Sequence, residues 1–300
     1  MATAFLEHLP ILQIVVPLMT APFCILLRRR ERSWAFALVL SWIVFAMSAM
    51  LLQRVLSEGL IIYSLGGWPA PWGIEYRIDA VNGFVAFIVS LIGAVVLLYA
   101  PRSVFSEMPD LRANLFFTAY LLCLTGLLGM TLTGDVFNVF VFLEISSLAS
   151  YALIATGPDR RALMASYRYL VMGTVGATFY VIGVGLLYMM TGTLNMADMA
   201  ERLQPVLMTR TVLASFAFLA VGLSLKLALF PLHLWLPNAY AYAPSVVTAF
   251  LAATATKVGV YVFVRFFYGI FGTRYAFDTL NLDNFLVPLG LAGIFVASLV

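Results

Sequence analysis

The chain has 300 residues, of which 63% are hydrophobic and only 10% are charged, and its formal net charge is +3. With a mean hydropathy of +1.01, this composition excludes a water-soluble globular protein and is typical of a polytopic membrane protein. No basic stripe suggests nucleic-acid binding, and the two cysteines and two histidines have no metal-ligand or disulfide spacing. We therefore predict no cofactor, no metal site and no nucleic-acid partner, and the lipid bilayer as surrounding solvent.

Apolar runs of about 20 residues, long enough to cross a bilayer, recur along the chain. A ninth run begins near Phe285 and is about sixteen residues long at Val300, which is short for a complete crossing. We therefore expect the chain to be a fragment of a longer protein. The predicted spans are residues 9–27, 34–56, 81–100, 114–133, 136–156, 164–191, 212–230 and 245–270.

Arginines determine the predicted orientation, because the cytoplasmic loops of membrane proteins carry an excess of Lys and Arg. Nine arginines lie on the connections at residues 28–32, 102–112 and 160–168, against six on the opposite connections. We predict a multi-pass protein of the cell (inner) membrane, with the N-terminus and the turn-rich loop of residues 57–79 outside. The first span is interpreted as a retained anchor, because a basic cluster follows it instead of preceding it.

The fourth and fifth spans are separated only by residues 133–135 and are predicted to form a tight helical hairpin. Asp135 is placed to cap the fifth span by accepting hydrogen bonds from its first backbone N–H groups. Glu144 is the one carboxylate deep within a span, and helical spacing puts Ser147 and Tyr151 on its face. This polar face is expected to contact protein or water and not lipid.

The sixth span is rich in glycine, and the spacing of Gly173 and Gly176 is interpreted as close helix packing. The connection at residues 191–210 contains Asn195, Asp198 and Glu201. We predict that it forms a short external amphipathic segment.

Residues 221–260 carry the features on which the functional hypothesis depends. This apolar stretch contains the only two lysines, Lys226 and Lys257, with His233 between them. A cation near the bilayer centre costs at least about 2.5–3.5 kcal/mol, so two such lysines indicate a functional site.

Three prolines interrupt the same stretch. Pro231 cannot donate a hydrogen bond to the carbonyl of Leu227, so the seventh helix is expected to break there. Unwound backbone at this depth is tolerated only when it lies against protein or water. Pro237 lies within the broken stretch, and Pro244 is expected to begin the eighth span.

One carboxylate, two lysines and a histidine at membrane depth form a candidate proton relay of Glu144, Lys226, His233 and Lys257. Burial and neighbouring charges shift the pKa values of such groups toward ambient pH. We expect Glu144 and Lys226 to interact directly or through one water; the alternative is a static ion pair that fixes helix packing. The expected supporting residues are Asp135, Ser147, Thr254 and Tyr261, where Thr254 and Tyr261 share the Lys257 face, with Pro231, Pro237 and Pro244 shaping the backbone.

At these residues the sequence resembles the antiporter-like membrane subunits of multisubunit Na+/H+ antiporters and of proton-pumping NADH–quinone oxidoreductases. The resemblance is carried by FLEISSLASYAL in the fifth span, LFPLHLWLPNAYAYAP in the broken region and TKVGVY in the eighth span. It covers essentially the whole chain. Within this superfamily, GDVFNVFVFLE and AYAYAPSVVTAFLAA are most similar to the D-type subunit of the antiporters.

The resemblance implies that Glu144 and Lys226 are the family's glutamate–lysine pair, that His233 is its broken-helix histidine and that Lys257 is its central lysine. It also implies a fold of two inverted five-helix repeats, each with a discontinuous helix. The second repeat is expected to be missing from this all-α chain. The expected domains are residues 1–110 (three scaffold helices), 111–270 (the first repeat) and 271–300 (the start of a ninth span).

The resulting hypothesis is a proton-translocating subunit of a multisubunit Na+/H+ antiporter, with other membrane subunits as partners and H+ and Na+ as ions. The alternative is a proton-pumping membrane subunit of a redox-driven complex, of NADH–quinone oxidoreductase or membrane-hydrogenase type. In the first case the chain is a transporter subunit and not an enzyme; in the second it is part of a redox translocase. A third reading is a scaffold that retains the ionisable residues for structure alone.

Overall fold

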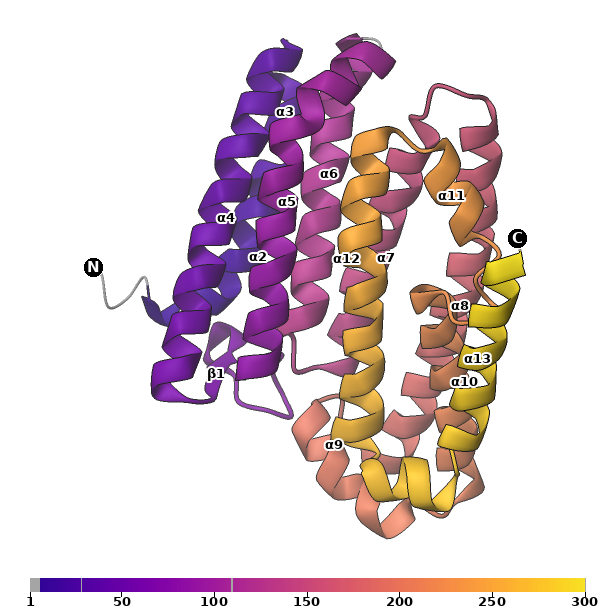
Figure 1. Ribbon diagram of the computed structural model, residues 1–300. Helices are drawn as coiled ribbons and strands as arrows, with labels where there is room; N and C mark the ends of the chain where they lie inside the picture. Colours follow the sequence, from indigo (N-terminus) through magenta and orange to yellow (C-terminus); the bar gives the residue numbers. More distant parts are fainter. Residues whose placement is uncertain (1–5, 28, 109, 300) are drawn as a thin grey trace.

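A computed structural model describes residues 6–27, 29–108 and 110–299 as a bundle of long helices (Figure 1). In this part of the chain, eight helical segments are long and apolar enough to cross a membrane, which confirms the predicted polytopic helical fold. The N-terminal residues 1–5 and Arg28, on which part of the predicted orientation rests, lie outside the described residues. The spanning helices are α2 and α3 (Leu9–Thr20 and Phe23–Leu26), α4 (Arg30–Glu58), α5 (Ala80–Glu107), α6 (Asp110–Leu132), α7 (Val136–Ala155), α8 (Arg161–Thr191), α10 (Arg210–Leu227) and α12 (Ser245–Val264).

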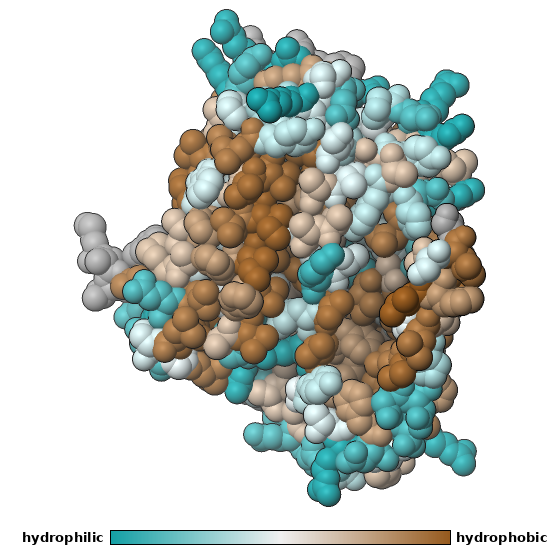
Figure 2. Space-filling model, in the orientation of Figure 1, coloured by the Kyte–Doolittle hydropathy of each residue, from teal (hydrophilic) through white to brown (hydrophobic). Residues whose placement is uncertain are grey.

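The surface has the polarity that a bilayer requires. Figure 2 shows a broad apolar band between two ends where hydrophilic side chains gather. The connections before α4, α6, α8 and α12 lie at one end, which is the end with more arginines, at the top of Figure 1. The last described helix, α13 (Asp283–Leu299), is apolar and shorter than the eight spans.

A small β-hairpin stands in the loop that was predicted only to be rich in turns. Strands β1 (Ile61–Ser64) and β2 (Glu75–Ile78) pair antiparallel, with Ile61 opposite Ile78. Each strand has only four residues, and the segment between them is rich in Gly and Pro, so the sequence predicted turns and not a pair of strands. At the tip, Trp68 and Trp72 are exposed.

The hairpin of α6 and α7 forms as predicted, since α6 ends at Leu132 and α7 begins at Val136. The predicted amphipathic segment is helix α9 (Met196–Leu203), whose Met196 and Met199 are buried while its polar side faces outward. Helix α12 lies centrally, in contact with α5 and α6 on one side and with α10 on the other (Figure 1).

Helices α8 and α10 approach closely enough for their backbones to touch. A Cβ atom added at Gly222 would lie 2.7 Å from the carbonyl oxygen of Gly176 and 2.8 Å from the backbone nitrogen of Tyr180. A Cβ atom at Gly173 would overlap the hydroxyl of Tyr151 on α7. Gly173 and Gly176 therefore serve helix packing, as predicted.

Candidate functional site

Lys226 lies in the last turn of α10 and is only 7% exposed. Its Nζ donates a hydrogen bond of 2.6 Å to the Oγ of Ser147 on α7. A cation in this position is also favoured by the negative end of the helix dipole. The polar face predicted on the fifth span thus meets the lysine of the seventh span inside the protein.

Glu144 lies one helical turn before Ser147 on the same face of α7 and is half-buried. Within the described residues, Glu144 and Lys226 form no ion pair with an N–O distance of 4.0 Å or less. The sequence predicted that Glu144 and Lys226 interact either directly or through one water, and the direct contact is absent. The Oε1 atom of Glu144 is buried without a protein partner, and such an oxygen requires a proton or a water molecule.

A cavity of about 10 Å³ adjoins Lys226 between α7, α8 and α10. Its lining includes Tyr169, Gly173 and Gly176, so the small residues that let the helices approach also leave this space. Because a water molecule needs roughly 10–15 Å³ of such volume, the cavity is at the limit for a single water beside the lysine.

The seventh helix is broken, as predicted, but the break begins at Ala228 and not at Pro231. Ala228 adopts a left-handed conformation (φ 59°, ψ 43°), and the N–H of Leu229 donates to the carbonyl of Ser224 at 2.9 Å. This is the helix-ending geometry that usually contains glycine. Pro231 lies within the turns that follow.

The other two prolines start helices instead of interrupting them. Pro237 lies in the first turn of α11 (Leu236–Tyr242), where its missing N–H costs nothing. Pro244 is the N-cap residue of α12, next to the first-turn position predicted for it. Pro244 therefore begins the eighth span as predicted, whereas Pro237 begins a short helix within the stretch that was expected to be broken.

Because a left-handed conformation costs an L-residue roughly 1–2 kcal/mol, Ala228→Gly is expected to increase the free energy of unfolding by about 1 kcal/mol. Ala228→Val should decrease it by at least as much, since β-branched residues tolerate this conformation worst. Thermal unfolding of the purified variants in detergent measures both effects. Equal stability of the two variants would contradict the assignment of Ala228 as the helix end.

A stack of aromatic side chains holds the broken segment in place. The ring of Trp235 lies parallel to Tyr169 at 3.9 Å between centroids, and Tyr169 meets Tyr151 edge-on at 4.6 Å. The Nε1 of Trp235 donates to the carbonyl of Leu225 at 3.1 Å. This role of Trp235 and Tyr169 could not be predicted from the sequence, because no local spacing connects the two residues.

His233 is not joined to either lysine by a hydrogen bond within the described residues. Its ring lies 5.3 Å from that of Phe230, and its Nδ1 is buried without a partner.

Lys257 is exposed on the surface of α12, where its Nζ donates to the carbonyl of Ala252 at 2.6 Å. Thr254 and Tyr261, expected on the same face, point inward instead. Thr254 donates to the carbonyl of Phe250 on its own helix, and Tyr261 donates to the carbonyl of Thr131 on α6. The structure therefore separates Lys257 from these two supporting residues.

Tyr240 and Thr256, two polar side chains near Lys257, were not among the predicted site residues. The Tyr240 hydroxyl on α11 is buried, lies beside Thr256 and has no partner in hydrogen-bond geometry. The Oγ1 of Thr256 lies 3.4 Å from the Nζ of Lys257. The run AYAYAP (residues 239–244) could have indicated Tyr240, because a tyrosine that follows a broken helix brings a hydroxyl to membrane depth.

Asp135 caps α7 as predicted and accepts a hydrogen bond of 2.7 Å from the backbone N–H of Asn138. Burial raises the pKa of Asp135, and the backbone N–H groups of Asn138 and Phe137 offset only part of this rise. In the described part of the chain, no group of three or more His, Cys, Asp or Glu side chains is placed to hold a metal ion.

Relatives of two kinds resemble the chain. It is 46% identical over 264 residues to a protein from Desulforudis audaxviator named NADH-quinone oxidoreductase subunit N, covering 87% of this chain and 52% of that one. It is 35% identical over 267 residues to a Bacillus subtilis protein named as the D subunit of a Na(+)/H(+) antiporter, covering 89% and 54% respectively. The chain thus spans about half the length of these relatives.

Solved structures agree with this grouping. A chain in the archaeal membrane-bound sulfane sulfur reductase complex is similar with a TM-score of 0.84 at 31% identity, covering 91% of this chain and 56% of that chain. A chain of the Mrp complex from Dietzia sp. is similar with a TM-score of 0.79 at 25% identity, covering 89% and 49%. The family described as NADH:quinone oxidoreductase/Mrp antiporter, transmembrane, matches residues 133–300, which include every residue of the site, and the chain belongs to this family.

Proposed function

We propose that this chain is a proton-translocating subunit of a multisubunit cation/proton antiporter in the cell membrane. The observation that carries the proposal is Lys226, a buried lysine at membrane depth held by the Ser147 hydroxyl one turn from a half-buried Glu144. Relatives named as the D subunits of Na(+)/H(+) and K(+)/H(+) antiporters support this reading. We propose Na+ as the cation that is exchanged for protons, with K+ as the other candidate.

In the proposed relay, a proton passes between Glu144 and Lys226, for which Ser147 and one water provide the hydrogen-bonded connection. From Lys226 the path continues past the Tyr240 hydroxyl to Thr256 and Lys257. The partnerless Tyr240 hydroxyl and the 3.4 Å Thr256–Lys257 contact support this route. The broken helix provides it with backbone that lies against protein and water.

His233 offers a second route between the lysines, through the broken segment. We further propose that residues 111–270 form the first of two repeats, that residues 1–110 serve as scaffold, and that the N-terminus faces outward. The exposed Lys257 would then meet the second repeat or a partner subunit, because lipid does not accommodate a bare ammonium group.

A redox-driven proton pump is the second candidate. The 46% identity to a protein named NADH-quinone oxidoreductase subunit N and the likeness to a chain of an archaeal respiratory complex favour it. The site chemistry is common to both functions, so the difference lies in the partner subunits.

The test is to purify the native complex through a tag on this chain, to identify its subunits and to reconstitute it in vesicles. An antiporter is expected to exchange Na+ or K+ for protons when a pH difference is imposed, without any electron donor. Proton uptake that requires an electron donor and acceptor, with no cation exchange, would favour the redox-driven alternative. Absence of both activities in an intact complex would favour the scaffold reading.

Tyr240→Phe is expected to slow proton-coupled transport about tenfold or more, because it removes the hydroxyl and leaves the ring in place. His233→Ala should have a smaller effect, because water can replace an imidazole as a proton carrier in the broken segment. Tyr242→Phe on the same helix is the matched control, because the Tyr242 ring faces Arg161 at the bundle end. A larger loss in His233→Ala than in Tyr240→Phe would favour the route through the broken segment.

A further inference from the structure

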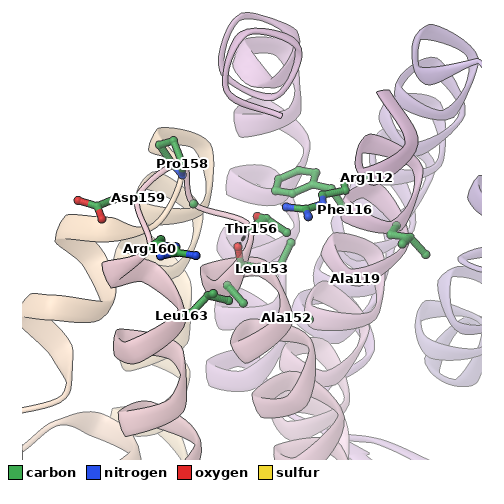
Figure 3. Close-up of a pocket in the computed structure, with 13 residues that line it drawn as sticks. Arg112, Phe116, Ala119, Ala152, Leu153, Thr156, Pro158, Asp159, Arg160 and Leu163 are labelled. Carbon is green, nitrogen blue, oxygen red and sulfur yellow. Dashed lines mark hydrogen bonds between the residues drawn. The ribbon is translucent and has the colours of Figure 1, made fainter. Parts of the chain in front are cut away.

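A groove of about 610 Å³ lies at the arginine-rich end of the bundle, where α6 and α8 begin and α7 ends (Figure 3). It plays no part in the relay between the lysines. Most of its lining is apolar, and Leu115 and Leu163 are 54% and 60% exposed. The apolar side chains of the groove include Leu115, Phe116, Ala119, Ala152, Leu153 and Leu163.

Two guanidinium groups converge on this groove. Figure 3 shows Arg112 from α6 and Arg160 from the connection before α8 pointing toward one another across it. In the described ranges of the chain, neither arginine forms an ion pair. Asp159, the one acidic residue of the lining, points away and accepts a hydrogen bond of 2.9 Å from the backbone N–H of Arg161.

The groove also lies at a defined depth. The fourth span begins at Arg112, the fifth ends at Ala155 and the sixth begins at Arg161, so the two guanidinium groups lie where the helices leave the apolar band. Lipid headgroups occupy this level, and basic pockets between spanning helices suit anionic headgroups. Guanidinium groups bind phosphate through paired, charge-assisted hydrogen bonds.

We propose that this groove is a binding site for an anionic phospholipid. Its phosphate lies between Arg112 and Arg160, and an acyl chain lies against Leu115 and Leu163. Two unpaired positive charges favour a lipid with net negative charge over a zwitterionic one, whose cationic group would be repelled. The exposed leucines favour a lipid over a free phosphate, because a soluble anion leaves them uncovered.

The test uses the purified chain with its copurifying subunits in neutral detergent, titrated with phosphatidylglycerol while bound lipid is counted by native mass spectrometry. Arg112→Gln combined with Arg160→Gln is expected to lower the affinity for phosphatidylglycerol by roughly 5- to 30-fold. Phosphatidylcholine with the same acyl chains should bind weakly to both proteins. The control is Arg210→Gln with Arg274→Gln, which removes two exposed arginines from the other end of the bundle and should leave the affinity unchanged.

Ala152→Phe provides a second variant that leaves the charge unaltered. It fills the groove with a ring and should also weaken phosphatidylglycerol binding. Unchanged affinity in both the double arginine variant and Ala152→Phe would overturn the proposal. So would equal displacement of the lipid by soluble glycerophosphate at the same concentration, which would identify a simple anion site.

Discussion

Lys226→Met is expected to reduce proton-coupled transport on the order of 100-fold or more, while the complex remains assembled and at least as stable. Methionine is unbranched and close to lysine in size, so it can stay buried, but it cannot carry a proton. The free energy of unfolding should stay level or rise, because a buried charge without an ion partner is replaced by an apolar group. Transport driven by a pH difference in vesicles, normalised to assembled complex, measures the loss.

Arg210→Met is the matched control, since it removes the same charge from the other end of α10, where the side chain is exposed. It should leave transport near the wild-type rate. Ser147→Ala should have an intermediate effect and change the pH profile, because it removes the partner that positions Lys226. Wild-type transport in Lys226→Met would exclude the lysine as a proton carrier.

Gly222→Ala is expected to decrease the free energy of unfolding by about 1–3 kcal/mol. The added methyl group would lie 2.7 Å from the Gly176 carbonyl oxygen and 2.8 Å from the Tyr180 nitrogen, and these backbone atoms cannot move without separating α8 from α10. Because α10 carries Lys226, the same shift should disturb the Ser147 hydrogen bond and slow transport. Thermal unfolding and vesicle transport measure the two effects.

Gly185→Ala on α8 should act in the opposite direction. A Cβ atom added at Gly185 has no atom within 4 Å, and alanine is the better helix former by roughly 1 kcal/mol. Stabilisation by Gly185→Ala beside destabilisation by Gly222→Ala would locate the effect in the α8–α10 contact. Equal stability of the two variants would contradict it.

Hydropathy alone was sufficient to predict the eight spans, because lipid requires a continuous apolar run from every helix that crosses it. The cap by Asp135 was predictable because it acts on the next turn of its own helix, and the packing role of Gly173 and Gly176 was predictable because their small size and spacing are visible in the sequence. The end of the seventh helix was placed too late, at residue 230. The left-handed residue at the end of this helix is Ala228, and an alanine in a sequence does not predict a left-handed conformation.

The candidate site was predictable in composition but not in connectivity. Helical spacing placed Lys257, Thr254 and Tyr261 within one angular sector, yet spacing cannot decide which edge of that sector faces the protein. Likewise, Tyr240 and Trp235 act through contacts with other helices. Such contacts depend on how the helices pack together, and a single sequence does not encode that packing as a local pattern.

The hydrogen bond from Lys226 to Ser147 allows Lys226 to lose and regain its proton without losing its partner. A hydroxyl both donates and accepts, so it can accept from an ammonium group and donate to a neutral amine by rotating its own hydrogen. An ionised carboxylate in that place could only accept, and the contact would weaken whenever the lysine lost its proton. With serine as the partner, Lys226 can alternate between its two charge states while its nitrogen and the helices α7 and α10 keep the same positions.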